Sequence, residues 1–176
     1  MAEISSNPKN SFSELIVLKL HYVYQDKFKV ERKAMPSKVH GKVVHIKGVT
    51  FNCITDSGHW VPIDGPPQFG GENGAIRPKE LLLVSLAGCT GSDVASILTK
   101  MRQNFHRFEV HVDADMADQH PKVYTNIRLT YKIWGDVEED KLQKAINLSQ
   151  EVYCAVTAML QKATNISHTY QINPPE

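Results

Sequence analysis

The pattern of hydrophobic positions predicts three short strands in the first half of the chain, beyond residue 38. Each strand is a run of β-branched and aromatic residues that ends in a turn signal, glycine beside a polar residue. We expect these strands at 43–46, 49–55 and 59–63. A loop rich in glycine and proline follows over 65–74. A helix is then expected from Pro78, because the missing N–H of proline costs nothing in a first turn, to about Arg102.

The second half predicts two longer strands, a second helix and a closing strand. The strand-like stretches are 108–114 and 123–134, and the closing strand is 168–172. The helix is expected over 138–164, where its first acidic residues suit the positive end of the helix dipole. The order βββ-α-ββ-α-β is segregated rather than strictly alternating, which predicts the α+β class.

Residues 1–38 differ from the remainder of the chain. They contain seven basic and four acidic residues and no glycine, whereas 39–176 carry a small net negative charge. The apolar run 15–24 is ambiguous between helix and strand. We interpret 1–38 as an N-terminal extension of unclear role outside a core domain at 39–176. A solvated tail, a docked arm and a partner- or nucleic-acid-binding appendage are the alternatives.

Composition narrows the classes of protein to consider. The 20 basic and 19 acidic residues give a net charge of +1, so no global positive field indicates nucleic acid as a partner. No apolar run approaches the roughly 20 residues of a membrane span, and the first residues lack a signal-peptide layout. Three cysteines do not form a secreted disulfide framework. We therefore expect a cytoplasmic protein with free or catalytic thiols and no membrane partner.

The first predicted helix is apolar on nearly every side, except around Cys89. Such a helix is buried all round, either against a partner chain or as the central helix of a monomeric sandwich. A buried free cysteine is most often a small hydrophobic residue. Here, however, the helical neighbours of Cys89 are polar, which indicates a polar stripe that needs hydrogen-bond partners or a solvated pocket. These neighbours are Ser85, Ser92, Asp93 and Ser96.

Cys154 repeats this arrangement on the second helix. That helix is expected to pack through Leu148, Val152, Ala155, Val156 and Met159, which places Cys154 on its polar side. Two cysteines on two polar stripes suggest one shared thiol pocket. Cys53 instead shares a strand face with apolar residues and is interpreted as structural.

Other chemistries lack their motifs. The sequence has no C-x-x-C and no H-E-x-x-H, and its eight histidines are scattered, so no metal site is predicted. No nucleophile elbow accompanies a Ser-His-Asp set, and 70–74 is a turn rather than a phosphate-binding loop. No cofactor is expected.

Six short motifs carry a family resemblance. They are Asp56-Ser57-Gly58-His59, Gly70-Gly71-Glu72-Asn73, Arg77-Pro78-Lys79-Glu80-Leu81-Leu82-Leu83, Gly88-Cys89-Thr90-Gly91-Ser92-Asp93-Val94, Glu151-Val152-Tyr153-Cys154-Ala155-Val156 and Asn165-Ile166-Ser167-His168. Together they resemble the OsmC/Ohr superfamily, and most of all its YhfA-like branch, over about 39–172. The resemblance implies an intertwined α+β homodimer in which two central helices pack between β-sheets.

The resemblance also implies thiol peroxidase chemistry in oxidative stress defence. Cys89 takes the position of the thiolate that attacks an organic hydroperoxide or peroxide, and Cys154 takes that of the resolving thiol. An external dithiol would then reduce the resulting disulfide. The thiolate is the reacting form, so this chemistry requires a depressed cysteine pKa.

The activating residues of the family pattern are missing at their usual places. No Arg lies between Val49 and Thr55, and the family Glu falls on Lys79. The candidate residues for the substrate pocket or for stabilising the thiolate are Arg77, Lys79, Glu80, Asp93, His59 and Arg102. An ionised Asp93 would raise the thiol pKa. The alternative function is a non-enzymatic dimer that binds a small ligand or senses electrophiles.

Overall fold

The computed structural model describes residues 38–175, which build two three-stranded sheets and three helices with two short helical turns. The elements in chain order are β1 (Gly41–Lys47), β2 (Thr50–Thr55), β3 (Trp60–Ile63), η1 (Pro67–Phe69), α2 (Pro78–Lys100), β4 (Asn104–Met116), β5 (Tyr124–Asp136), α3 (Glu139–Leu148), η2 (Ser149–Tyr153), α4 (Ala155–Leu160) and β6 (Asn165–Ile172). Their order agrees with the predicted α+β class.

A compact unit begins at Gly41. The predicted extension at 1–38 lies outside the described residues except for Lys38. Its boundary and its role therefore stay predictions.

The first sheet has the order β1-β2-β3 and is antiparallel throughout. The predicted turn between β1 and β2 is present, and Gly48 adopts a positive φ of 53° there. A Cβ at Gly48 would lie 2.4 Å from the carbonyl oxygen of Gly70, so only glycine fits this turn. None of the residues of this sheet is fully buried, and Val43, Ile46 and Trp60 are more than half exposed.

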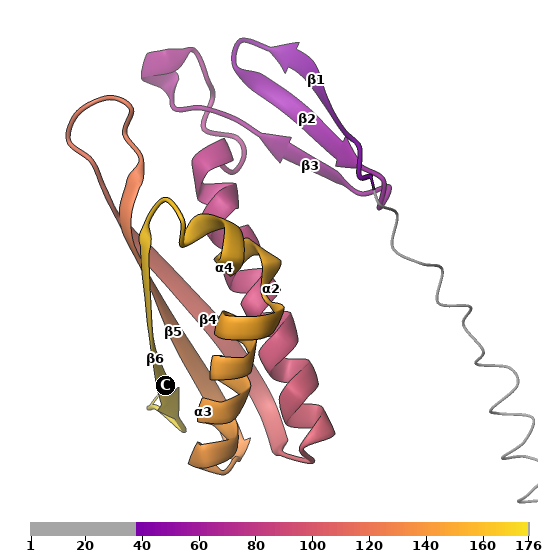
Figure 1. The fold of residues 1–176 in the computed structure, drawn as a ribbon. Helices are drawn as coiled ribbons and strands as arrows, with labels where there is room; N and C mark the ends of the chain where they lie inside the picture. The colour runs from indigo at the N-terminus through magenta and orange to yellow at the C-terminus, as the bar shows by residue number, and fades with distance from the viewer. Residues whose placement is uncertain (1–37, 176) are drawn as a thin grey trace, which may run out of the picture. The chain divides into compact units, whose positions relative to one another are not determined.

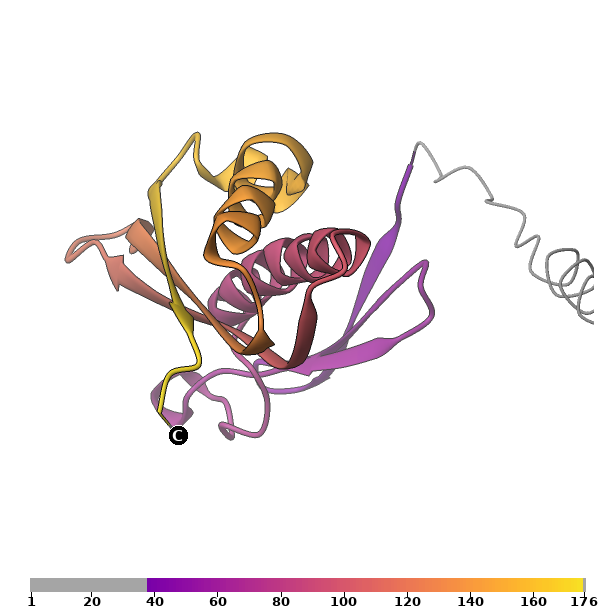
Figure 2. The same cartoon turned by 90° about the horizontal axis from the view of Figure 1, so that it is seen from below.

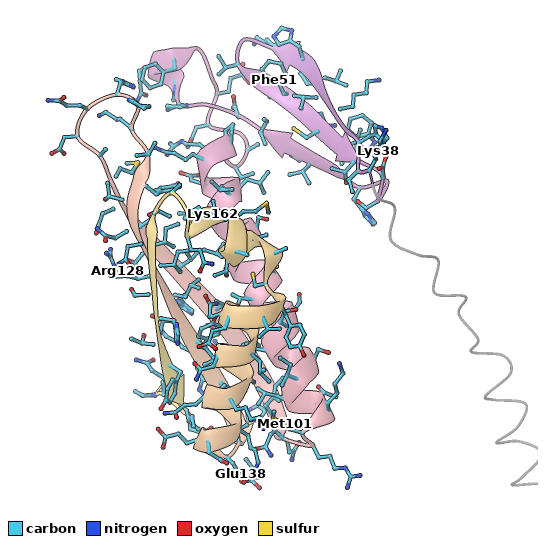
Figure 3. The ribbon with its side chains drawn as sticks, in the orientation of Figure 1. Lys38, Phe51, Met101, Arg128, Glu138 and Lys162 are labelled. Carbon is cyan, nitrogen blue, oxygen red and sulfur yellow. The ribbon has the colours of Figure 1, made fainter. Side chains whose placement is uncertain are left out.

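The second sheet has the order β4-β5-β6, and the helices cover one of its faces (Figure 1, Figure 2). β5 pairs antiparallel with β4 and parallel with β6, which the chain reaches after crossing over through α3, η2 and α4. Side chains alternate strictly along β5, as expected for a strand with one buried face. The opposite face is polar: Arg128 donates to Asp113 and Asp115 at 2.7 Å, on the side of the sheet away from the helices (Figure 3).

The core lies between the second sheet and the helices. α2 contributes a row of residues spaced by four, β5 contributes alternate residues, and α3 contributes its apolar side. The fully buried members are Leu86, Thr90, Val94, Leu98, Ile127, Leu129, Tyr131, Ile133, Leu142, Ala145 and Ile146. Because burial of apolar surface is the dominant favourable term in folding, this contact is a main source of the stability of the fold.

The prediction of one continuous second helix over 138–164 was wrong. The chain forms α3, then a π-helical turn in which the Cys154 N–H bonds to the Ser149 carbonyl at 2.8 Å. The backbone leaves helical geometry at Cys154, with φ −71° and ψ 99°, before α4 begins. The strands beside the helices are also longer than predicted, because β4 begins at Asn104 and β6 at Asn165.

This interruption moves the buried face of the segment. A π turn adds one residue to the turn, so later side chains rotate by about 100° relative to a straight helix. Three of the predicted packing residues are accordingly exposed: Ala155, Val152 at 65% and Met159 at 63%. Cys154 and Thr157 are buried instead. At Cys154, the side of the second helix that was predicted to be polar therefore faces the interior of the protein.

α2 begins at Pro78, as predicted, and ends at Lys100. It is apolar on more sides than the remainder of the chain covers. Leu82 is 41% exposed and Val84 is 52% exposed. The expectation that no apolar run approaches a membrane span was wrong for α2, which is long and apolar enough to cross a membrane by length and composition alone; 28% of that stretch is buried in the chain. Its buried row in the fold marks it as a core helix with one side left uncovered.

Asp64 organises the loop between β3 and α2. Its carboxylate is 2% exposed and accepts backbone hydrogen bonds from Gly74, Gly65 and Glu72 at 2.7–3.0 Å, with a fourth from the Thr50 hydroxyl. The backbone N–H groups of Gly74 and Gly65 contribute most to lowering its pKa to about 2. An ionised Asp64 therefore holds the loop in place.

We predict that Asp64→Asn lowers the melting temperature at neutral pH by several degrees, because the loop N–H groups lose a charged acceptor. The folded pKa of Asp64 lies below its ordinary value of 3.8, so this stabilisation is complete above about pH 4 and is lost as the pH falls toward 2. Thermal melts of wild type and variant should therefore converge in acid. Asp118→Asn, in an exposed loop, is the matched control. A difference that stays constant down to about pH 2 would contradict this role.

Candidate functional site

The two predicted cysteines meet between α2 and the π-helical segment, and Asp93 lies with them. The Cys89 Sγ, the Cys154 Sγ and a carboxylate oxygen of Asp93 all lie within 4.8 Å of one another. Both thiols are free. Cys154 is 3% exposed, and Cys89 and Asp93 are half-buried. The predicted shared thiol pocket is present within a single chain.

Helix geometry positions two of these three groups. Cys89 and Asp93 are four residues apart on α2, so their side chains lie one turn apart on the same face. Cys154 comes from the break between η2 and α4 and caps α4, where its Sγ accepts the Thr157 N–H at 3.4 Å. The break thus turns Cys154 toward α2.

The surroundings of Cys89 favour the thiol over the thiolate. Burial raises the pKa of Cys89 above its usual 9.0, and the neighbouring Cys154 and Asp93 raise it further. One group opposes them: the backbone N–H of Val156 donates to the Cys89 sulfur and lowers the pKa. The depressed pKa that the family chemistry requires is therefore not found in one chain.

A buried network of hydroxyl groups lies behind the thiols. The Thr90 hydroxyl lies 2.6 Å from the Tyr131 hydroxyl and 2.9 Å from the Ser149 hydroxyl. The Gln150 side-chain amide donates to Thr90 at 2.9 Å and to Tyr131 at 2.7 Å. Ser149 in turn donates to the Asp93 carboxylate at 3.1 Å. The network connects α2, β5 and η2 to the carboxylate of the site.

Sequence reasoning missed most of this network. Burial raises the pKa of Tyr131 to about 12, so its phenol stays protonated and serves as a neutral hydrogen-bonding group. Thr90 follows Cys89 directly, and Ser149 and Gln150 interrupt an apolar stretch of the second helix. Polar residues within apolar stretches could have indicated this network, because buried hydroxyl groups need hydrogen-bond partners.

The chain does not bring Arg77, Lys79 and Glu80 to Cys89. Lys79 precedes Cys89 by ten residues on α2, which is about 15 Å along the axis at 1.5 Å per residue. Arg77 bonds to Glu80 at 3.0 Å in a capping box. Lys79 donates to the Lys122 carbonyl at 2.9 Å. These residues line a separate cavity of about 440 Å³ with Phe69, Leu83, Met116 and Tyr124.

The other predicted residues also lie on elements away from the thiols. His59 is exposed in the turn before β3, and Arg102 is exposed after α2. Cys53 is half-buried in β2, in register with Val43 and Val61, and belongs to a different sheet from the one that supports the site. Cys53 is not part of the core cluster of the described residues.

A cavity of about 390 Å³ begins at Asp93 and runs along α2. Its lining includes Ser96, Lys100, Leu148 and Tyr153. Asp93 is the residue of the thiol site that lines this cavity. A small molecule in this cavity would lie beside the Asp93 side chain.

Comparisons with known proteins agree with the motif resemblance. Residues 71–169 match the model of the family described as OsmC-like protein. Protein YhfA of Escherichia coli K12 is 34% identical over 135 residues, which cover 76% of this chain and 98% of YhfA.

Solved structures show the same fold. A hypothetical protein from Aquifex aeolicus VF5 is 33% identical with a TM-score of 0.69, covering 81% of this chain and all of that one. An organic hydroperoxide resistance protein OsmC from Legionella pneumophila is 15% identical with a TM-score of 0.60, covering 78% of this chain and 98% of the other. The structure therefore has the OsmC-like fold, and the chain belongs to the OsmC-like protein family.

Proposed function

We propose that this protein is a thiol-dependent peroxidase that reduces a small organic hydroperoxide or peroxide in oxidative stress defence. The observation that carries the proposal is the meeting of the Cys89 and Cys154 sulfurs within 4.8 Å. Cys89 is the nucleophile because it is the more accessible thiol, and the buried Cys154 is the resolving thiol. The hydroperoxide resistance proteins among the structural neighbours support the same class of chemistry.

The reaction has three steps. The Cys89 thiolate attacks the O–O bond, which gives a sulfenic acid on Cys89 and releases the alcohol, or water from hydrogen peroxide. The Cys154 thiol then attacks the sulfenic sulfur, which forms the Cys89–Cys154 disulfide and releases water. An external dithiol reduces this disulfide and is itself oxidised, which restores both thiols.

The raised pKa of Cys89 limits the rate of the first step, the attack of the thiolate on the peroxide. A small fraction of Cys89 is thiolate at neutral pH, since burial and Asp93 disfavour the charge. The amide of Val156 is the stabilising donor in place of an arginine. We therefore expect slower turnover than in family members that keep the activating arginine.

A homodimer is part of the proposal. One chain leaves apolar side chains exposed on α2 and on the segment around Cys154, including Val84, Val152, Tyr153 and Met159. A second copy would cover these faces, and its cationic side chains would have access to the thiols. The reducing cytoplasm is the proposed location, because the chemistry needs free thiols. No membrane and no nucleic acid take part in this proposal.

One observation favours the alternative, a sensor or ligand-binding dimer without turnover. The groups that act on the Cys89 thiol are Cys154, the Val156 amide and Asp93, and none of them is a cationic side chain. In such a sensor, peroxide would oxidise the cysteine pair once, and adding a dithiol would not give repeated reduction of peroxide.

The first prediction from the proposed function concerns the disulfide itself. Treating the reduced protein with cumene hydroperoxide or hydrogen peroxide should join Cys89 to Cys154, faster with the organic peroxide, as mapped by mass spectrometry. Cys154→Ser should instead accumulate the sulfenic acid of Cys89, because the resolving thiol is gone. Cys53→Ser should behave as wild type. Oxidation confined to Cys53, or a Cys89→Ser protein that consumes peroxide normally, would refute the peroxidase proposal.

The second prediction concerns pH. Because the pKa of Cys89 lies above its usual value, its oxidation rate should rise roughly tenfold per pH unit from neutral pH up to that pKa. Asp93→Asn removes a negative charge and lowers the pKa, so it should speed oxidation at neutral pH a few-fold. Stopped-flow measurement of sulfenic acid formation gives both rates. A slower Asp93→Asn protein would show that Asp93 assists the reaction instead.

The third prediction concerns assembly. Light scattering at micromolar concentration should give about twice the 19.8 kDa mass of one chain. Val84→Glu places a charge on the uncovered side of α2 and should reduce the mass to that of one chain, whereas Lys144→Glu on the exposed side of α3 should not. A monomeric wild-type protein would remove the dimer from the proposal.

A further inference from the structure

The thiol site unites three groups that carry negative charge when deprotonated, without a cationic side chain among them. Cys89, Asp93 and Cys154 hold their donor atoms within 4.8 Å of one another. Arg77 and Lys79 lie at the far end of α2 from this site and are engaged elsewhere, Arg77 with Glu80 and Lys79 with the Lys122 carbonyl. Lys100 lines the cavity that begins at Asp93. Two thiolates and a carboxylate at this separation repel one another unless protons or a cation lie between them.

We propose that Cys89, Asp93 and Cys154 form a binding site for a single Zn²⁺ ion, with two sulfur ligands, one oxygen ligand and an open fourth position. Binding releases the two thiol protons to water and changes no oxidation state. The site goes beyond the proposed peroxidase and does not depend on it. No sequence motif indicates this site, because Cys154 lies 61 residues beyond Asp93 along the chain and meets the other two ligands only through the fold.

The geometry fits this metal. Zinc takes sulfur at about 2.3 Å and carboxylate oxygen at about 2.0–2.2 Å, so tetrahedral ligand atoms lie roughly 3.5–3.8 Å apart. The separations here are at most 4.8 Å, so movements of about 1 Å by side-chain rotation would bring the three atoms to these distances. Cys89 and Asp93 are a pair four residues apart on a helix, the spacing that lets two side chains chelate one ion. Sulfur ligands favour zinc over Mg²⁺ or Ca²⁺.

Neighbouring groups orient all three ligands. Ser149 donates to Asp93 at 3.1 Å and is itself fixed by the fully buried Thr90. The N–H groups of Val156 and Thr157 donate to the sulfurs of Cys89 and Cys154, respectively. Such supporting bonds to ligand atoms are characteristic of metal sites. The cavity of about 390 Å³ that Asp93 lines gives an ion and its water access to the carboxylate ligand.

The proposal is tested by titrating the reduced full-length protein with Zn²⁺ in a calorimeter, without competing thiols. We expect one ion per chain. Co²⁺ as a spectroscopic probe should give thiolate-to-metal charge-transfer absorption in the near ultraviolet. Cys89→Ser and Cys154→Ser should each weaken this absorption. Asp93→Asn should lower the zinc affinity roughly 10-fold or more, since even the loss of a supporting group costs about that much.

Cys53→Ser is the control and should bind as wild type. Circular dichroism verifies that each variant is folded. If a cysteine variant is unstable, Asp93→Asn still tests the site, because it keeps the shape of the side chain. Unsaturable binding, binding that Cys53→Ser abolishes, or folded Asp93 and cysteine variants that bind as wild type would overturn the proposal. The readout is independent of peroxide. Zinc binding without disulfide formation, or the reverse, therefore separates this proposal from the proposed function.

Discussion

The site depends on the hydrogen bonds made by the Thr90 hydroxyl. This one group, fully buried in α2, contacts Tyr131 on β5 and Ser149 and Gln150 on the π-helical turn. Leaving such buried partners unsatisfied costs about 1–3 kcal/mol for each group. The π turn is not favoured by its own backbone geometry, and these contacts hold it in place. The turn in turn directs Cys154 inward, so the meeting of the two sulfurs follows from the packing of α2 against its neighbours.

Much of the fold could be predicted from hydrophobic periodicity. The alternation along β5 and the apolar length of α2 identify a one-sided sheet and a core helix without any tertiary information. The proline at the start of α2 also fixed its first turn. The motif stretches located both cysteines of the site. Their proximity followed from the expectation that polar positions on otherwise apolar helices face a common pocket.

The break at Cys154 could not be predicted in the same way. Residues 149–153 contain no proline and no glycine, so local sequence favours a continuous helix. The break exists because Ser149 and Gln150 find partners on α2 and β5, which are far away in sequence. A prediction that assumes an uninterrupted helix therefore assigns Val152 and Met159 to the core and Cys154 to the polar side, whereas Val152 and Met159 are exposed and Cys154 is buried. The distance of Lys79 from Cys89, by contrast, follows from helix rise alone.

The electrostatics of the site connect its two proposed uses. A thiolate on Cys89 gains an amide donor from Val156 but is opposed by burial and by the Asp93 carboxylate. Any positive charge that enters, whether an ion or a side chain of a second copy, relieves this repulsion and stabilises the thiolate. An ion bound by both sulfurs also occupies the lone pairs that would attack a peroxide. The break at Cys154 suits both proposed uses. It directs the Cys154 sulfur toward Cys89, and the N–H groups of Val156 and Thr157 that follow it donate to the two sulfurs. The two proposed uses would therefore compete for one set of atoms, and the negative charge of the Asp93 carboxylate favours a bound cation over a free thiolate.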